Sequence, residues 1–311
     1  MAAVNTLGID VGGTTTVVAL LDAHNHVRGE ASFPTRPEAG FEDCIGRIGR
    51  AAAELPADFG AAGAAVAAYV DSRTGILAGS PNLRWENVPF GPRLAEELGV
   101  PVAVENDVNA AAYGEFRADL AARQPLLAVF VGTGVGGGLI TGGDIYRGAD
   151  GFGVELGHVP VVAEGGELCG CGRRGCVEAY AGGSAIVRRA ADRASDTAFD
   201  DVDAVVRAAD AGDDACRVAL DQAAEYLGMA LAAAVNLFNP GTLVMGGGVT
   251  RAWPPLIERA AARMRESALP SSLAALAVRP ALLGGRAGVV GAAALAHDTL
   301  AGGRADNTCD A

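Results

Sequence analysis

Lysine is absent from this chain of 311 residues, so all 24 basic residues are arginine. Three chemistries that depend on a lysine amine are therefore excluded: a Walker A phosphate loop, the strand lysine of protein kinases and a Schiff-base nucleophile. Any phosphate group that the protein binds must be held by backbone amides, hydroxyl groups, arginines or a metal ion.

Long apolar runs and an excess of positive charge are also lacking. No stretch of about 18 residues is apolar without polar breaks, and no basic segment precedes an apolar run at the start, so we expect no membrane span and no signal peptide. The net charge of −13 argues against nucleic acid or an anionic membrane as a partner. The few cysteines are those of a metal motif or unpaired, which fits a reducing cytoplasm.

Half of the residues are hydrophobic, which indicates a globular chain long enough for two domains. A strand, a Gly/Thr turn and a strand occur near residue 7 and again near residue 126, and helices follow each time. In the first half we expect strands at 7–10, 17–21, 27–33, 61–68 and 101–105, with helices at 41–55 and 108–117. In the second half we expect strands at 126–131, from 139, at 242–245 and at 277–283, with a helical run over 184–238 broken near Asp196, a helix after Pro255 and a last helix at 288–300.

This internal similarity predicts two related α/β halves that face one cleft. We expect a smaller N-terminal domain over 1–118, completed by the helix at 288–300. A larger domain over 119–287 carries an inserted metal loop, and a polar, frayed tail follows at 301–311.

Four metal-ligating residues cluster in one segment: His158, Cys169, Cys171 and Cys176. Three thiols and one imidazole fit a tetrahedral zinc ion, and a site with four protein ligands is closed and structural. The cysteines could instead be buried apolar residues or disulfide partners, but Cys169 and Cys171 are too close along the chain to pair comfortably. The sequence therefore predicts a zinc-ordered loop that presents Glu155, Glu178 and a free ring nitrogen of His158.

Two Gly/Thr turns follow expected strands, at residues 12–16 and 132–138. Consecutive backbone N–H groups in such turns cradle anions, and threonine hydroxyls add donors, although either turn could also be an ordinary hairpin connection. Asp10, just before the first turn, could hold Mg²⁺ directly or through water. Glycines 246–248 follow another strand and allow close backbone approach, for instance to a flat adenine.

Asn106 and Asp107 end one strand and begin a helix. Aspartate is a favoured helix N-cap, which is a purely structural role. A carboxylate at the carboxyl end of a strand also stands where α/β clefts bind ligands, and there Asp107 could take the proton of a hydroxyl nucleophile during phosphoryl transfer. The two roles are compatible, and the local sequence does not choose between them.

Together these motifs resemble those of the ROK family of sugar kinases, and of its bacterial glucokinases in particular, over residues 7 to about 300. The zinc segment, Gly-His followed by Cys-x-Cys-Gly-x-x-Gly-Cys-x-Glu, is the most specific part. The resemblance implies an α/β fold of the two-domain, actin-like ATPase (ribonuclease H-like) type, with duplicated halves and an inserted zinc loop.

The resemblance also implies a role for each matching residue. Nucleotide contacts would come from Asp10, Gly12, Gly13, Thr14, Thr15, Gly132, Thr133, Gly134, Gly136, Gly246, Gly247 and Gly248. Sugar contacts would come from Asn82, Asn106, Asp107, Glu155, His158 and Glu178. Asp107 would be the catalytic base, and Asp10 would hold magnesium directly or through water.

The implied activity is ATP-dependent phosphorylation of a hexose 6-hydroxyl group, with glucose as the sugar, ATP and Mg²⁺ as cofactors, structural Zn²⁺, and a homodimer or homotetramer as the assembly. Open alternatives are a kinase for an amino or N-acyl hexose (glucosamine, kanosamine, N-acetylmannosamine or N-acetylglucosamine) and a glucokinase that uses polyphosphate. A sugar-responsive repressor would need a DNA-binding domain ahead of Leu7 and a different charge.

The chain departs from the family pattern at two positions of interest. Thr15 stands where lysine is common, and Ala68 stands where the family often has a glycine whose backbone lies near the sugar. We expect the methyl group of Ala68 to narrow the sugar site on one face.

Overall fold

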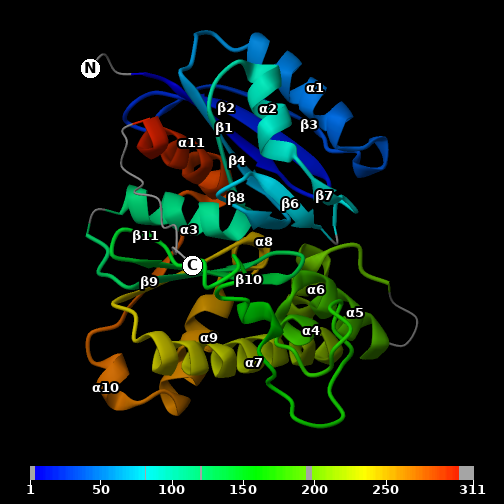
Figure 1. Ribbon diagram of the computed structural model, residues 1–311. Coiled ribbons are helices and arrows are strands. Elements are labelled where there is room, and N and C mark those ends of the chain that lie inside the picture. The colour runs from blue at the N-terminus through cyan, green and yellow to red at the C-terminus, as the bar shows by residue number, and fades with distance from the viewer. Residues whose placement is uncertain (1–3, 81, 120, 194–197, 301–311) are drawn as a thin grey trace. The chain divides into compact units, whose positions relative to one another are not determined.

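The computed structural model describes residues 4–80, 82–119, 121–193 and 198–300 (Figure 1). The expected helix break near Asp196 and the expected tail at 301–311 lie outside these residues. The chain divides into two compact units. Unit 1 consists of Met1–Leu120, Arg147–Gly153 and Arg286–Ala311, and unit 2 of Ala121–Tyr146 and Val154–Gly285.

A mixed five-stranded sheet forms the centre of unit 1. Its order is β3-β2-β1-β4-β8, in which β1, β2 and β3 are antiparallel neighbours while β4 and β8 run parallel to β1. The strands are β1 (Thr6–Val11), β2 (Thr15–Leu21), β3 (Val27–Pro34), β4 (Ala61–Val66) and β8 (Val102–Asn106). Because β1 and β4 are apolar almost throughout and buried along nearly their whole length, they form the core of this unit.

Four α-helices cover this sheet: α1 (Phe41–Ala53), α2 (Phe90–Leu98), α3 (Asp107–Ala118) and α11 (Ala287–Leu300). Helix α11 packs directly on β1 and β4 because glycines on both strands face it. A Cβ atom placed on Gly8 would lie 2.1 Å from the carbonyl oxygen of Val289, and one on Gly63 would lie 1.9 Å from that of Ala292. The last helix of the chain is therefore part of the first unit (Figure 1).

A second, small sheet of unit 1 consists of β5 (Tyr69–Asp71), β6 (Ile76–Gly79) and β7 (Glu86–Val88) in antiparallel order. The sequence gives no prediction for these strands, because segments of three or four residues carry too little periodicity. Helix α2 follows β7, and a short 3₁₀ turn, η1 (Pro37–Ala39), precedes α1.

Unit 2 repeats the sheet of unit 1. Its order is β11-β10-β9-β12-β13, again with three antiparallel neighbours followed by two parallel strands. The strands are β9 (Leu126–Val131), β10 (Val135–Thr141), β11 (Asp144–Ile145), β12 (Thr242–Gly246) and β13 (Ala277–Pro280). The identical order and strand senses are what the repeated sequence pattern predicts.

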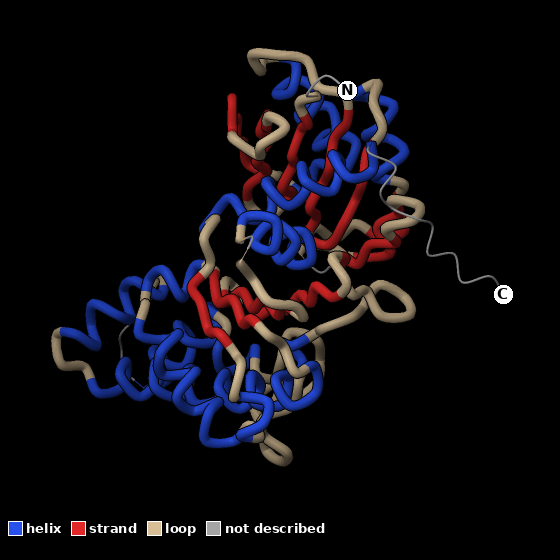
Figure 2. The backbone as a smooth tube through the Cα atoms, turned by 90° about the vertical axis from the view of Figure 1, so that its left-hand side faces the viewer, coloured by secondary structure: helices blue, strands red, loops and turns tan. Residues whose placement is uncertain are grey.

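Most helices of unit 2 gather on one side of its sheet (Figure 2). The helical elements of unit 2 are η2 (Leu156–His158), α4 (Glu178–Ala181), α5 (Gly183–Arg193), α6 (Val202–Asp210), α7 (Asp214–Phe238), α8 (Gly248–Ala252), α9 (Pro255–Ser267) and α10 (Pro270–Leu273), and η3 (Gly284–Arg286) leads into α11. Helix α7 is long and apolar enough to cross a membrane by length and composition, but 61% of its most apolar window is buried inside the unit, as in the core helix of a folded domain.

Several expected boundaries shift for identifiable reasons. The helical run has a second break at Gly212, whose φ of 102° ends α6, and the side chain of Asp213 then caps α7 by accepting from Cys216 N–H at 3.0 Å. Strand β10 begins at Val135, so three glycines expected in the second Gly/Thr turn are strand residues. Strand β13 ends at Pro280, although the N–H of the next residue, Ala281, still donates to Met245 O of β12 at 2.8 Å.

Candidate functional site

The first Gly/Thr turn joins β1 to β2 and is braced by Thr35, a residue that is fully buried. The Thr35 hydroxyl donates to Gly12 O at 2.7 Å, and its backbone N–H donates to Thr14 O at 2.8 Å. With these carbonyls held from one side, the N–H groups of Gly13 and Thr14 make no hydrogen bond within the described part of the chain. These two N–H groups are available to an anion. The contribution of Thr35 is not predictable from sequence, because it lies 23 residues from Gly12 along the chain.

Asp10 and Asp107 stand at the carboxyl ends of parallel strands in the same sheet. Asp10 pairs with Ala65 of β4, which pairs with Glu105 of β8, two residues before Asp107. Burial, and with it the negative charge of Asp107, raises the pKa of Asp10 to about 7. A cation at this edge would relieve both effects, so Asp10 fits a magnesium-holding role.

Asn106, and not Asp107, is the N-cap of α3. The Asn106 side-chain oxygen accepts from the N–H groups of Val108 at 3.0 Å and Asn109 at 3.1 Å, so Asp107 is the first helical residue. The Asn106 amide group donates to Ala68 O at 3.2 Å and to Oδ1 of Asp107 at 3.0 Å. The interpretation of Asp107 as the helix N-cap is therefore wrong. Asn106 is the N-cap, and its side chain holds the carboxylate of Asp107.

A buried ion pair lies directly behind this strand end. Glu105 is 3% exposed, and its Oε2 accepts from Arg147 Nε at 2.8 Å. Its other oxygen accepts from Asn106 N–H at 3.0 Å and from the side-chain amide of Asn109 at 3.2 Å. The sequence does not predict this ion pair, because its two residues are 42 positions apart, one in a strand and the other in a distant loop.

Asn82 is an exposed residue of the loop between β6 and β7. Ser80 fixes this loop, donating to Ala67 O at 2.6 Å and accepting from Leu83 N–H at 3.0 Å. A Cβ atom on Gly13 would lie 3.3 Å from Asn82 Cβ, so the loop lies beside the first Gly/Thr turn.

Ala68 does not line an open site. It is 4% exposed, and its methyl group belongs to the hydrophobic core of unit 1, contrary to the expectation that it narrows a sugar site. The next residue, Tyr69, contacts the ring of Phe152 with ring centroids 5.1 Å apart.

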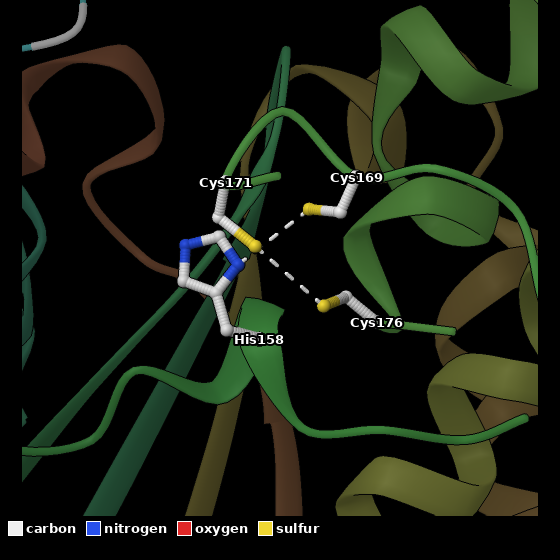
Figure 3. A group of neighbouring side chains, drawn as sticks. All are labelled: His158, Cys169, Cys171 and Cys176. Atoms are coloured by element: carbon white, nitrogen blue, oxygen red, sulfur yellow. Dashed lines mark hydrogen bonds between the residues drawn. The ribbon is translucent and has the colours of Figure 1, made fainter. Parts of the chain in front are cut away.

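In unit 2 the four expected metal ligands converge (Figure 3). The sulfur atoms of Cys171 and Cys176 are 3.8 Å apart, Cys169 Sγ is 3.7 Å from His158 Nδ1, and all four ligand atoms lie within 4.8 Å of one another. Tetrahedral Zn–S bonds of about 2.3 Å put two sulfur atoms about 3.8 Å apart, so the spacing suits zinc.

The pKa values of the three thiols shift in different directions. Burial raises the pKa of Cys169 to about 12 and also raises the pKa of Cys176. A hydrogen bond from the Arg173 backbone N–H lowers the pKa of Cys171. Two buried thiols with raised pKa values become thiolates at neutral pH only beside a strong positive charge, which a metal ion supplies.

The two carboxylates that flank the metal ligands take different positions. Glu155 Oε2 lies 3.9 Å from His158 Nε2, the ring nitrogen that is not turned toward the thiols. Burial raises the pKa of Glu155, and the charge of Glu178 adds to this while His158 opposes it. Glu178 instead reaches the second Gly/Thr turn, where its Oε2 accepts from Val135 N–H at 3.0 Å.

The second Gly/Thr turn comprises residues 132–134. Gly183 N–H donates to Gly132 O at 2.8 Å, and Ser184 N–H donates to Thr133 O at 3.2 Å. Among the described residues no hydrogen bond leaves Thr133 N–H or Gly134 N–H, so these groups are available to an anion, as in the first turn. Gly136, expected in this turn, lies in β10 opposite Phe130.

The three glycines expected near a nucleotide end β12 and begin α8. Gly247 has a φ of 103°, and a Cβ atom there would lie 2.3 Å from Val131 O at the end of β9. Only glycine fits this close approach of two strand ends. The six expected sugar contacts divide between the units: Asn82, Asn106 and Asp107 in unit 1, and Glu155, His158 and Glu178 in unit 2.

Comparison with known proteins gives one consistent family. The family model described as "ROK family" matches residues 6–299. A glucokinase of Halalkalibacterium halodurans is 32% identical over 92% of this chain and 92% of its own length, and a glucokinase of Thermotoga maritima is 33% identical over 95% and 98%. A ROK family glucokinase of Streptomyces griseus, solved in complex with glucose and AMPPNP, superposes with a TM-score of 0.82 at 33% identity, covering 94% of this chain and 99% of its own. This chain therefore belongs to the ROK family.

Proposed function

We propose that this protein is a sugar kinase that transfers the γ-phosphoryl group of ATP to the 6-hydroxyl group of a hexose, with glucose as its substrate. The full-length similarity to glucokinases supports the activity, and the glucose and AMPPNP bound by the Streptomyces griseus relative support both ligands. The observation that carries the proposal in this chain is the pair of carboxylates at one sheet edge. Asp107 is aimed by Asn106, and Asp10 has a pKa that responds to the charge of Asp107.

In this reaction Asp107 is the general base. Its carboxylate accepts the proton of the sugar hydroxyl as the oxygen attacks the γ-phosphorus, and the bond to the β-phosphate oxygen breaks to release ADP. The free N–H groups of the two Gly/Thr turns hold phosphate oxygens, which replaces the lysine that the chain lacks. Glycines 246–248 are assigned to the nucleoside side of the site.

Magnesium is assigned to Asp10, directly or through water. A buried carboxylate whose pKa is raised by burial and by a second carboxylate fits a cation-holding role. When bound, the ion supplies positive charge to the phosphate groups. The position of the ion would be determined by Asp10, whose backbone is held in place by the pairing of β1 with β2 and β4.

Zinc is assigned to His158, Cys169, Cys171 and Cys176, whose spacing fits a tetrahedral ion. Four protein ligands would leave no open position on the ion, so the site would order the loop and would take no part in proton or phosphoryl transfer. His158 would bind it through Nδ1, which leaves Nε2 and Glu155 to face a sugar hydroxyl.

Sugar recognition is assigned to Asn82, Glu155, His158 and Glu178 together with Asp107. Asn106 is assigned mainly to positioning, because both amide hydrogens and both lone pairs of its side chain already have protein partners. A site whose polar side chains each pair with a sugar hydroxyl group discriminates against sugar analogues that leave some of these side chains without a partner. We expect glucose or an unacylated amino-glucose to have a higher kcat/KM than N-acetyl hexoses.

A coupled assay of ADP release over a panel of hexoses, aminohexoses and N-acetyl hexoses tests the proposal, with polyphosphate offered in place of ATP in a parallel series. Turnover of glucose with ATP is the expected result. Absence of turnover with every sugar and donor, combined with measurable sugar binding, would favour a sugar-responsive regulator instead.

The assembly and compartment are part of the same proposal. We expect a homodimer or homotetramer, which light scattering coupled to size-exclusion chromatography measures. The five cysteines among the described residues are all free thiols, which is compatible with a reducing cytoplasm.

A further inference from the structure

Glu178 connects the metal loop to the second Gly/Thr turn. It begins α4 two residues after the ligand Cys176, and its Oε2 accepts from Val135 N–H, at the point where the turn becomes β10. Its other oxygen, Oε1, lies 3.6 Å from Cys169 Sγ. One carboxylate thus contacts both a metal ligand and the turn assigned to phosphate.

The surroundings of this contact leave room for nothing larger than glycine. A Cβ atom on Gly134 would lie 2.2 Å from Glu178 Oε2, and one on Gly157 would lie 2.1 Å from Val135 O and 3.4 Å from the same carboxylate oxygen. A Cβ atom on Gly182 would lie 2.9 Å from Thr133 O. Residues on both sides of the metal ligands therefore enclose the turn at contact distance.

Three backbone groups in and beside the turn have hydrogen-bond partners outside it. Its carbonyls of Gly132 and Thr133 are taken by the first N–H groups of α5, and the Val135 N–H is taken by Glu178. Because these groups are held by protein partners, the N–H groups left over are those of Thr133 and Gly134. The shape of the phosphate cradle thus depends on an acceptor at the position of Glu178.

We propose that Glu178, in addition to the sugar contact assigned to it above, is a positioning residue for nucleotide binding. Through it, the order of the metal loop sets the affinity of the second Gly/Thr turn for phosphate. The proposal rests on the proposed function, since it assumes that this turn holds nucleotide phosphates. If Glu178 acted only in sugar binding, replacing it would not change the affinity for nucleotide measured in the absence of sugar.

The experiment is titration calorimetry of Mg·ADP into the metal-loaded protein with no sugar present. Glu178→Ala removes the charged acceptor of the Val135 N–H, and Glu178→Asp keeps the charge but shortens the reach by one methylene group. Both are expected to weaken ADP binding roughly 10- to 100-fold, the range for a hydrogen bond to a charged group. Glu178→Gln keeps an acceptor of the same length and is expected to stay within about threefold.

Glu155→Gln is the matched control, because Glu155 flanks the same metal ligands but contacts His158 and not the turn. It should weaken sugar binding and leave ADP affinity within about twofold. Metal content and the circular dichroism spectrum of each variant identify any that has lost the ion or the fold. Hydrogen exchange of the Val135 amide can be measured in the unmutated protein. We expect the protection of this amide against exchange to fall when the metal is chelated.

The outcomes separate cleanly. Unchanged ADP affinity in a metal-loaded, folded Glu178→Asp protein, or a Val135 amide indifferent to metal removal, overturns the role of Glu178. An unmutated protein that binds no nucleotide overturns the proposed function itself, whatever the Val135 amide does.

Discussion

The side-chain amide of Asn106 donates a hydrogen bond of 3.0 Å to Oδ1 of Asp107, the residue that follows it. The same Asn106 side chain caps α3 through its oxygen, so a single residue starts the helix and aims the carboxylate. The Val108 N–H donates to the same oxygen at 3.0 Å. A base at this position is therefore held in a fixed orientation before any substrate arrives.

Asp107→Asn tests this base. The variant keeps the size of the side chain but cannot accept a proton, so kcat should fall roughly 10²- to 10⁴-fold, with sugar affinity changed much less. Steady-state kinetics and sugar titration measure the two quantities. Asp58→Asn, at an exposed carboxylate of the same unit, should leave both unchanged. Near-normal turnover by Asp107→Asn would assign the proton to another group.

Asn106 permits the two roles of its side chain to be separated. Asn106→Ala should lower the free energy of unfolding by about 1 kcal/mol through loss of the cap, and should also lower kcat because Asp107 loses its donor. Asn106→Ser retains a cap oxygen but has no amide to reach Asp107. We expect Asn106→Ser to recover most of the stability and little of the turnover; recovery of both together would mean that the amide contact to Asp107 has no catalytic effect.

Asp10 gives a pH dependence with a definite sign. Its pKa is raised from 3.8 to about 7 in the folded protein by burial and by Asp107, so between these values the unfolded chain releases a proton that the folded chain keeps. The stability of the magnesium-free protein should therefore fall as pH rises from about 4 to about 7, and Asp10→Asn should remove this fall. Thermal unfolding from pH 5 to pH 8 should show Asp10→Asn melting above the unmutated protein at pH 8, with the difference shrinking toward pH 5. Magnesium with ADP should raise the melting temperature of the unmutated protein only.

We expect the order of the loop from 156 to 178 to depend on the proposed zinc ion. Cys171→Ser removes one ligand, so the purified variant should lose its zinc, and sugar affinity should fall with it because the ion orders the residues that face the sugar. Elemental analysis and sugar titration measure the two effects. Cys216→Ser, at a buried thiol in α7 that is far along the chain from the ligands, should retain zinc. Full activity of metal-free protein after strong chelation would contradict the structural role.

The sequence predicts most of this fold, and the reasons for the failures are physical. Apolar runs such as 126–131 with flanking Gly/Thr turns predict the two central sheets, because buried strands need uninterrupted apolar residues. The metal ligands are predictable because their spacing is local. Thr35 and Arg147 are not, since each acts on a partner 23 or 42 positions away that only the folded chain brings near.

The position of Ala68 illustrates the same limit. The family pattern identifies it as a departure from glycine beside the sugar, but only the packing of β4 and β5 decides on which side its methyl group lies. That methyl group is in the core, so Ala68→Gly should affect stability more than sugar choice.

The ion pair of Glu105 with Arg147 supports the site from behind, and the last prediction concerns it. Arg147→Met keeps an unbranched, apolar stem but leaves a carboxylate that is 3% exposed without its nearest cation. Removing one partner of a buried pair destabilises a protein by about 3 kcal/mol or more, whereas replacing both partners costs much less. Arg147→Met alone should therefore lower the free energy of unfolding strongly, and Glu105→Gln combined with Arg147→Met should recover a large part of it. Because Glu105 also accepts from Asn106 N–H, the single variant should lower kcat while KM for ATP stays near its original value. Denaturant titration of both single variants and the double variant measures the coupling, and strictly additive effects would show that the pair does not act as one unit.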